Sequence, residues 1–223
     1  MSKQQNKKVL ITELIILVTL LIISFLLWDT YFVYPIKLCA VLLHELSHAV
    51  AGIVSGGAIV EMNIGFDLGG KCVIEGGNTI LIASAGYLGS LFLGLILFIS
   101  PNNKKTGFWV INLISATIFL LSVFTASNTV FIILALLLSS LLTASSFYMK
   151  IPIVTIFIRA FGLISCVYVL FDIKEDILSN NYQISDASIL SGMIDLPAAI
   201  IGISWGIISI AAIYFAMRVS YKN

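Results

Sequence analysis

Two histidines and a glutamate in one apolar segment are the residues best suited to chemistry. They stand in the run His44-Glu45-Leu46-Ser47-His48, and the chain of 223 residues holds only 2 histidines. Residues four apart lie on the same face of a helix, so both imidazoles can bind one Zn²⁺. Glu45 lies about 100° around the helix from His44, within reach of a water on that metal. Zinc brings the pKa of such a water near 7, and a carboxylate can take its proton as it attacks a carbonyl.

The surroundings of this run favour a functional interpretation. It lies within a helix predicted over Ile36–Val54, whose other residues are almost all apolar. Ionisable groups inside a membrane are expensive and usually mark functional sites. The alternative is a pair of structural histidines packed against backbone carbonyls, with Glu45 extending to the surface.

A catalytic zinc takes three protein ligands and leaves one position open, so a third ligand is required. With both histidines used, the candidates are the carboxylates and Cys39, the nearest thiol in the sequence. We predict Asp172 as the third ligand, and Asp176 as a second candidate ligand or a partner of a ligand. Either carboxylate could instead be a solvated charge at a helix end. We interpret Ser185-Asp186-Ala187 as the cap of a short helix.

Seven apolar segments are long enough to cross a hydrocarbon layer of about 30 Å as helices. They lie at Val9–Trp28, Pro35–Val54, Thr79–Ser100, Gly107–Ser127, Thr129–Met149, Ile151–Phe171 and Pro197–Met217. The first is longer than the 7–15 apolar residues of a signal peptide, so we interpret it as a transmembrane helix. The break at 125–128 is weak, which leaves six spans and a re-entrant piece as the alternative. Arg159 is expected to extend to the interface or to pair with an acid such as Glu13.

Two segments do not have the character of a span. Ser55–Asn78 is rich in glycine and predicts a hairpin of two short strands, Ala58–Ile64 and Lys71–Ile74. Bare strand edges are not tolerated in lipid, so the hairpin should lie at the interface or beside a polar cavity. Its edge could pair with an extended substrate. Asp172–Leu196 is the most acidic stretch and is interpreted as a loop on the solvent side.

Three further residues are candidates for substrate binding. Asn63 is the polar residue of the predicted hairpin that could hold a substrate backbone, although a turn or edge position would also explain it. Gly86 and Gly89 form a small face on the third span, which could press against the histidine helix and leave room for substrate. Simple helix packing is the alternative for this face.

The composition excludes a soluble domain. Apolar residues make up 60% of the chain, charged residues only 10%, and the net charge is +1. Soluble domains have about 25% charged residues, and no basic run is present that would indicate a nucleic-acid partner. We therefore predict an all-α polytopic membrane protein with six to seven transmembrane helices and a small glycine-rich β-hairpin near the active site. A multi-pass protein of a bacterial cell membrane, in contact with the lipid bilayer, is expected.

In their order, these motifs resemble the site-2 protease clan of intramembrane zinc metalloproteases, and more closely its compact site-2-protease-like peptidases. The matching pieces are Leu43–Ala49, the glycine-rich hairpin, Ala83–Ser90, Leu170–Asp176, Ser185–Ala187 and Trp205. The resemblance implies His44 and His48 as zinc ligands, Glu45 as the catalytic base and Asp172 as the third ligand. Better-known members carry glycine after that aspartate, whereas Ile173 follows it here.

The sequence thus predicts an amino-terminal transmembrane helix over residues 1–34 and a membrane metallopeptidase domain over residues 35–223. The predicted activity is that of a zinc metalloendopeptidase, which hydrolyses peptide bonds of membrane-embedded or juxtamembrane protein substrates with a zinc-bound water and a glutamate base. The alternative is a catalytically inactive membrane zinc-binding protein that binds transmembrane segments. Intact Glu45 argues against that alternative, because a protein without turnover has no chemical need for this carboxylate.

Overall fold

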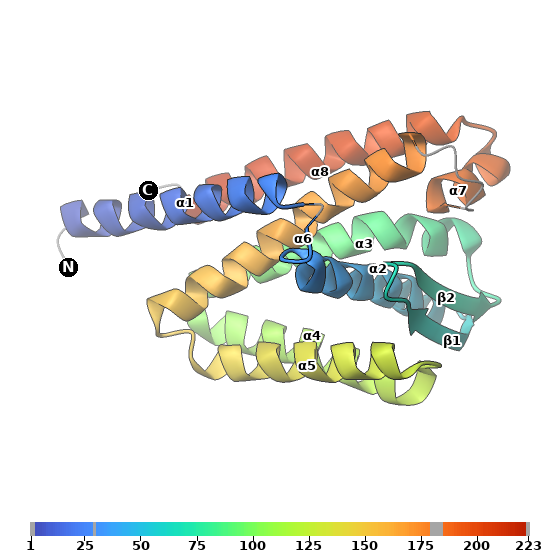
Figure 1. The fold of residues 1–223 in the computed structure, drawn as a ribbon, viewed down its shortest axis with the longest axis horizontal. Coiled ribbons are helices and arrows are strands. Elements are labelled where there is room, and N and C mark those ends of the chain that lie inside the picture. The colour runs from blue at the N-terminus through green and yellow to red at the C-terminus, as the bar shows by residue number, and fades with distance from the viewer. Residues whose placement is uncertain (1–2, 29, 179–184, 222–223) are drawn as a thin grey trace.

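The computed structural model describes residues 3–28, 30–178 and 185–221, without the side chains of residues 3–10 and 175–178. The described chain forms helices and one two-stranded sheet (Figure 1). The long helices are α1 (Lys3–Leu26), α2 (Tyr34–Val54), α3 (Thr79–Ile99), α4 (Lys104–Thr125), α5 (Thr129–Phe147), α6 (Pro152–Leu178) and α8 (Ala198–Tyr221). The shorter elements are β1 (Ala58–Ile64), β2 (Gly70–Glu75), the 3₁₀ helix η1 (Ser100–Asn102) and α7 (Asp186–Ile194).

Six helices of the described chain, α2 to α6 and α8, are long and apolar enough to cross a membrane. The apolar part of α1 that is described, Ile11–Leu26, is shorter. The predicted fold class is confirmed: the protein is mostly helical, with six candidate membrane spans and one small antiparallel hairpin. The weak break at 125–128 is a true helix boundary, because the Asn128 side chain accepts a hydrogen bond from the Phe131 backbone N–H and caps α5.

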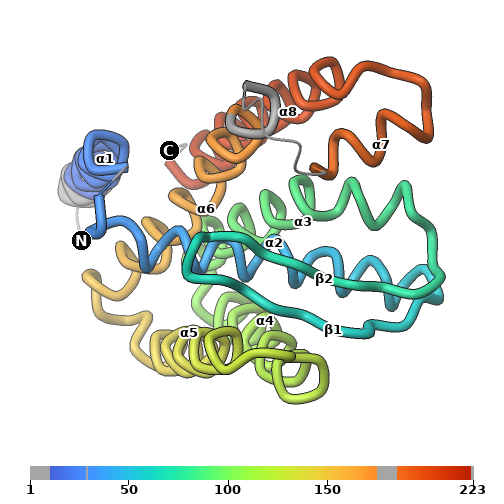
Figure 2. The backbone as a smooth tube through the Cα atoms, turned by 45° about the vertical axis from the view of Figure 1, so that its right-hand side comes forward, coloured from blue at the N-terminus to red at the C-terminus, as the bar shows by residue number. Residues whose placement is uncertain are grey.

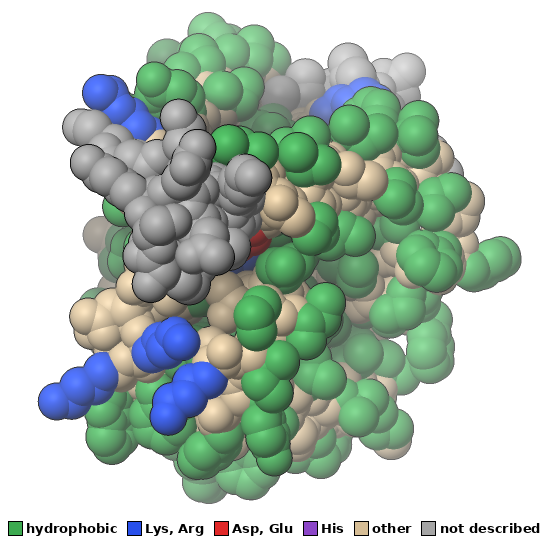
Figure 3. Space-filling model, turned by 90° about the vertical axis from the view of Figure 1, so that its left-hand side faces the viewer, with side chains coloured by type: hydrophobic (Ala, Val, Ile, Leu, Met, Phe, Trp, Pro, Cys, Tyr) green, Lys and Arg blue, Asp and Glu red, His purple; other side chains and the backbone are tan. Residues whose placement is uncertain are grey.

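The outer surface is largely apolar, as a lipid-facing surface must be. Figure 3 views the molecule from one end and shows hydrophobic side chains over much of that face, with a few Lys and Arg side chains among them. Phe92, Trp109 and Phe124 are each more than 60% exposed. Contiguous apolar exposure on this scale is rare in soluble monomers. These observations agree with a multi-pass integral membrane protein.

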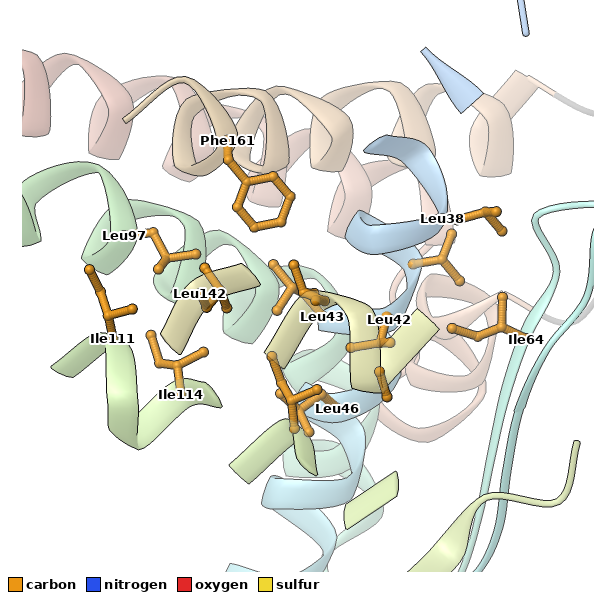
Figure 4. Close-up of a cluster of buried hydrophobic side chains, with 14 of the residues drawn as sticks. Leu38, Leu42, Leu43, Leu46, Ile64, Leu97, Ile111, Ile114, Leu142 and Phe161 are labelled. Atoms are coloured by element: carbon orange, nitrogen blue, oxygen red, sulfur yellow. The ribbon is translucent and has the colours of Figure 1, made fainter. Parts of the chain in front are cut away.

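Helix α2 is the most buried of the candidate spans, with 67% of its apolar window inside the molecule. In Figure 2 it runs between α3 and the hairpin. Figure 4 shows its apolar side, where Leu38, Leu42, Leu43 and Leu46 meet side chains from β1, α3, α4, α5 and α6. Close packing of this kind holds helices together in lipid, where the hydrophobic effect gives little. Packing thus fixes the apolar side of α2. The polar residues of this helix lie on its other side.

Helix α3 packs against both α2 and α6, which requires small residues at the contacts. A Cβ on Gly94 would lie 2.8 Å from the carbonyl oxygen of Gly162, closer than real Cβ contacts. The backbones of α3 and α6 therefore touch at this point. Tyr221, at the end of α8, contacts Glu13 in the middle of α1. Both termini lie at the same end of the molecule (Figure 1).

The predicted hairpin is confirmed. Strands β1 and β2 pair antiparallel, with Met62 opposite Cys72 and a bulge between Ile59 and Glu61. The outer edge of β1 is covered by the turn between α4 and α5, because Ser127 N–H donates to the Met62 carbonyl over 2.9 Å. The Asn128 side-chain amide likewise donates to the Ile64 carbonyl over 2.8 Å.

The interpretation of Asp172–Leu196 as a loop is wrong for most of the residues that the structure describes, because they are helical. Helix α6 continues to Leu178, and α7 begins at Asp186. Helix α7 then packs back onto α3 and α8 through Ala187 and Leu190, which are 2% and 5% exposed. Asp186, at the start of α7, is therefore drawn toward the interior.

Candidate metal centre

Three side chains from two distant segments converge on one point. His44 and His48 lie one turn apart on α2, and Asp186 is the first residue of α7. The Nε2 atoms of the two histidines are 3.1 Å apart. Asp186 Oδ2 lies 3.1 Å from each of those nitrogens. The three atoms thus form a triangle with equal sides.

This triangle fits a zinc ion. Ligand atoms about 2.0–2.1 Å from a tetrahedral zinc lie about 3.3 Å from one another, close to the observed spacing. Asp186 Oδ2 is buried, and apart from the two histidine Nε2 atoms it has no hydrogen-bond partner among the described residues. A Cβ on Gly86 would lie 2.3 Å from that oxygen and 2.5 Å from His44 Nε2, so only glycine leaves the ligand atoms in place. Two imidazoles and a carboxylate are also a ligand set found in catalytic zinc sites.

Asp186 reaches this point because α7 is capped and docked. The Ser185 side chain accepts a hydrogen bond from Ser188 N–H over 3.2 Å and starts the helix. Burial raises the pKa of Asp186, but hydrogen bonds and charges from the two imidazoles outweigh burial and lower the pKa to about 2. The carboxylate is therefore ionised at neutral pH, which is the form that binds metal ions.

The other ring nitrogens also have partners. His48 Nδ1 donates to the backbone carbonyl of Ile82 over 2.7 Å, which leaves its Nε2 free as an electron-pair donor. Asp172 Oδ2, from α6, lies 3.6 Å from His44 Nδ1. The rings of His44 and Tyr87 meet edge to face, with their centroids 5.1 Å apart. These contacts fix the orientation of both imidazoles.

A cavity of about 390 Å³ adjoins the triangle, and Glu45 is in its wall. Glu45 is only 5% exposed. The cavity is lined by α2, by the turn and second strand of the hairpin, by the start of α3 and by residues of α6 and α7. A carboxylate beside a metal centre, within a cavity walled by a strand edge, can serve as a base in the hydrolysis of an extended peptide.

A comparison with family models agrees with a site for peptide hydrolysis. The model of the Peptidase M50B-like family matches residues 17–216. The chain belongs to the Peptidase M50B-like family. This is the site-2 protease family, whose members are membrane metalloproteases and are zinc-dependent in general. No curated protein and no solved structure matches the chain.

Within this M50B-like chain, the predicted histidines and Glu45 line one cavity, and Asp172, the predicted third ligand, lines it too. Asp172 faces His44 Nδ1, on the side of the ring away from the triangle, and Asp186 faces the Nε2 atoms. The side chain of Asp176 lies outside the described residues. The sequence signal for Asp186 is Ser185-Asp186-Ala187, a piece of the family resemblance that we interpret from the sequence as a helix cap and not as a ligand.

The other candidate residues divide between the site and its surroundings. Gly86 touches the metal-binding atoms, and a Cβ on Gly89 would lie 2.7 Å from Ser47 Cβ, which makes it a contact between α3 and α2. Asn63 pairs with Lys71 within the hairpin and is not among the residues that line the cavity. Cys39 does not belong to the metal-binding group.

Sequence reasoning overlooked Cys72, which does line the cavity. Burial, with a smaller contribution from the Glu45 charge, raises the pKa of this thiol to about 12. Its sulfur is not among the converging side-chain atoms, which belong to His44, His48 and Asp186.

Proposed function

We propose that this protein is an integral membrane zinc metalloendopeptidase that hydrolyses peptide bonds of membrane-embedded or juxtamembrane protein substrates. The observation that carries the proposal is the triangle of His44 Nε2, His48 Nε2 and Asp186 Oδ2, with sides of 3.1 Å, beside the buried Glu45 in a membrane helix bundle. Membership of the M50B-like family supports the peptidase class.

His44, His48 and Asp186 would hold the zinc ion. A bound zinc ion would lower the pKa of a water and polarise the scissile carbonyl. Glu45 takes the proton of the attacking water and then gives it to the leaving amine. Asp172 Oδ2 lies 3.6 Å from His44 Nδ1, and its negative charge favours the tautomer that carries the proton on Nδ1 and presents Nε2.

The assignment of Asp186, in place of Asp172, rests on which ring nitrogen each carboxylate faces. Two histidines one turn apart share a metal through atoms that point the same way, and here these are the Nε2 atoms. Asp186 Oδ2 is equidistant from both, whereas Asp172 is near the opposite nitrogen of one ring. Asp172 thus suits the supporting position that metal-binding histidines usually have.

The hairpin supplies a binding mode for the substrate. The outer edge of β1 is covered, whereas Gly70, Lys71 and Cys72 of β2 line the cavity. A substrate that has unwound to an extended conformation can add to this edge as a further strand, with its backbone directed along the cavity. A membrane protein that loses its helical structure locally is therefore the substrate class that we propose. The sequence-based expectation of a bacterial cell membrane stays a prediction.

The alternative, a zinc-binding protein without turnover, is not favoured. It would not require the carboxylate of Glu45 to be buried beside the histidines, at a cost that only a function would offset.

Two measurements test the proposal. Zinc per chain is determined by mass spectrometry on protein purified in detergent, and we expect about one equivalent for the wild type. His48→Ala and Asp186→Asn should lose the zinc. The matched control is Asp195→Asn at the other end of α7, an exposed residue at φ 56° where asparagine is also tolerated. It should keep the zinc.

Cleavage is then followed by comparing the membrane proteomes of cells that express the wild type or Glu45→Gln. The variant should keep the zinc and lose the fragments that the wild type produces. Full cleavage by Glu45→Gln would refute the peptidase mechanism, and zinc-free wild-type protein would refute the metal site.

A further inference from the structure

The β-hairpin is fastened along α2 at three points. At its turn, the Tyr34 hydroxyl, at the start of α2, donates to the backbone carbonyl of Phe66. At its base, a Cβ on Gly52 of α2 would lie 2.8 Å from Ile74 Cδ1 of β2, so β2 packs directly on the helix. Between them, Gly70 lies against the side chain of Glu45. The hairpin is thus fixed to the helix on both sides of the proposed catalytic base.

The contact at Gly70 leaves no space for a side chain. A Cβ there would lie 2.1 Å from Glu45 Oε1, 2.7 Å from Cδ and 2.8 Å from Cγ. All three distances are below those of real Cβ contacts. The backbone of the hairpin therefore forms one wall of the space that the Glu45 carboxylate occupies.

The turn before Gly70 is built to keep this wall in place. Gly65 N–H donates to the Gly69 carbonyl over 2.7 Å, and the Asp67 carboxylate accepts from Gly69 N–H over 3.1 Å. Leu68 has a φ of 67°, an unusual conformation for a residue with a side chain. The first strand is held in turn by the hydrogen bonds of Ser127 and Asn128. The turn is therefore restrained from both sides and does not simply rest on the helix.

We propose that the hairpin turn is the element that positions Glu45 for proton transfer, and that Gly70 and Tyr34 are its positioning residues. The inference rests on the proposed peptidase function. Glu45 sits on α2, but α2 alone leaves its side chain free to rotate; the hairpin backbone limits it to one region beside the metal-binding atoms. Strand β2, which begins at Gly70, also provides the edge proposed for the substrate. The hairpin therefore sets the position of both the base and the scissile bond. A misplacement of about 1 Å can cost about a hundredfold in rate.

Gly70→Ala is the direct test, because the added methyl group must displace the carboxylate. We expect kcat to fall about tenfold or more, with zinc content and thermal stability close to those of the wild type and a much smaller change in KM. The matched control is Gly206→Ala in α8, where an added Cβ would meet no atom within 4 Å. It should leave kcat unchanged. A parallel fall of zinc content and stability in Gly70→Ala would indicate a purely structural role and overturn the inference.

A second pair of variants tests whether both residues act through Glu45. Tyr34→Phe removes the hydroxyl that holds the turn and should lower kcat by a smaller factor, with the zinc retained. Glu45→Asp removes the Oε1 atom that the added Cβ would meet at 2.1 Å, so in this background Gly70→Ala should lower kcat by a smaller factor than in the wild type. Equal losses in the two backgrounds would overturn the inference.

Failure of the inference can be distinguished from failure of the proposed function. If Glu45→Gln is inactive but Gly70→Ala and Tyr34→Phe keep full kcat, the hairpin does not position the base and the peptidase proposal stands. If Glu45→Gln still cleaves, the proposed function fails, whatever the hairpin variants do.

Discussion

The protein buries two groups of ionisable side chains, one toward each end of α3. The first is the proposed metal centre with His44, His48 and Asp186. The second joins Arg159 of α6 to Glu13 of α1, Tyr221 of α8 and Asn102 of η1. Both lie within the apolar bundle, where polar groups are costly. The two groups differ in how their hydrogen-bond donors and acceptors match. This difference distinguishes a metal-binding site from a structural contact.

In the Arg159 group, donors meet acceptors. Arg159 Nη1 donates to Glu13 Oε1 over 2.5 Å and Nη2 donates to Asn102 Oδ1 over 2.6 Å. The Tyr221 hydroxyl donates to the same glutamate oxygen over 3.1 Å. Only Arg159 Nε lacks a partner among the described residues. Opposite charges compensate one another, so the group requires no further component.

In the metal centre, atoms of the same kind face one another. Two ring nitrogens and a carboxylate oxygen converge, and the oxygen has no hydrogen-bond partner other than those nitrogens among the residues described. Gly86 leaves space beside them, whereas the aromatic ring of Tyr221 fills the space beside Arg159, 5.3 Å from its Cζ. Convergent electron-pair donors beside a cavity indicate a cation site. Complementary charges indicate a clamp between helices.

The largest effect is expected from a variant that breaks the clamp, which consists of the contacts of Arg159 with Glu13, Tyr221 and Asn102. Arg159→Met leaves Glu13 buried without its partner, and the free energy of unfolding should fall by about 3–5 kcal/mol, measured by denaturation in detergent. Zinc content of the folded fraction should not change. The double variant Glu13→Leu/Arg159→Met should recover most of the loss, because no uncompensated charge remains. Loss of zinc from folded Arg159→Met protein would contradict the separation of the two groups.

A smaller effect is expected at the edge of the metal centre. Asp172→Asn weakens the support of His44 Nδ1 and should reduce zinc affinity about 10–100-fold, measured by competition with a chelator. Asp195→Asn serves again as the control and should leave the affinity unchanged. Complete loss of zinc from Asp172→Asn, with zinc retained by Asp186→Asn, would make Asp172 the third ligand, as the sequence predicted.

The smallest effect concerns one hydroxyl of the clamp. Tyr221→Phe removes a hydrogen bond to Glu13 and one from Arg159 but keeps the ring. The free energy of unfolding should fall by about 1 kcal/mol, and kcat should be unchanged. A lowered kcat at unchanged stability would show that the two groups are coupled along α3.

Features set by neighbours in the chain were predictable from the sequence. His44 and His48 share a face because a helix repeats every 3.6 residues, whatever surrounds it. The helices and the hairpin follow from runs of apolar residues and from the glycines between them, and the structure has them close to the predicted bounds. The pairing of Arg159 with Glu13 was predicted among alternatives and is confirmed, because a charge in lipid needs a partner and few are available.

Features set by packing between distant segments were decided only by the tertiary structure. Asp172 and Asp186 are both acids that follow the same span, and nothing local determines which one faces the Nε2 atoms. The choice depends on α7 folding back onto α3 and α8 and on Gly86 leaving room there. The contact of Gly70 with Glu45 likewise joins residues that the sequence separates by a turn, a strand and half a helix. Spacing fixes which side chains share a face, whereas the packing of helices fixes what that face meets.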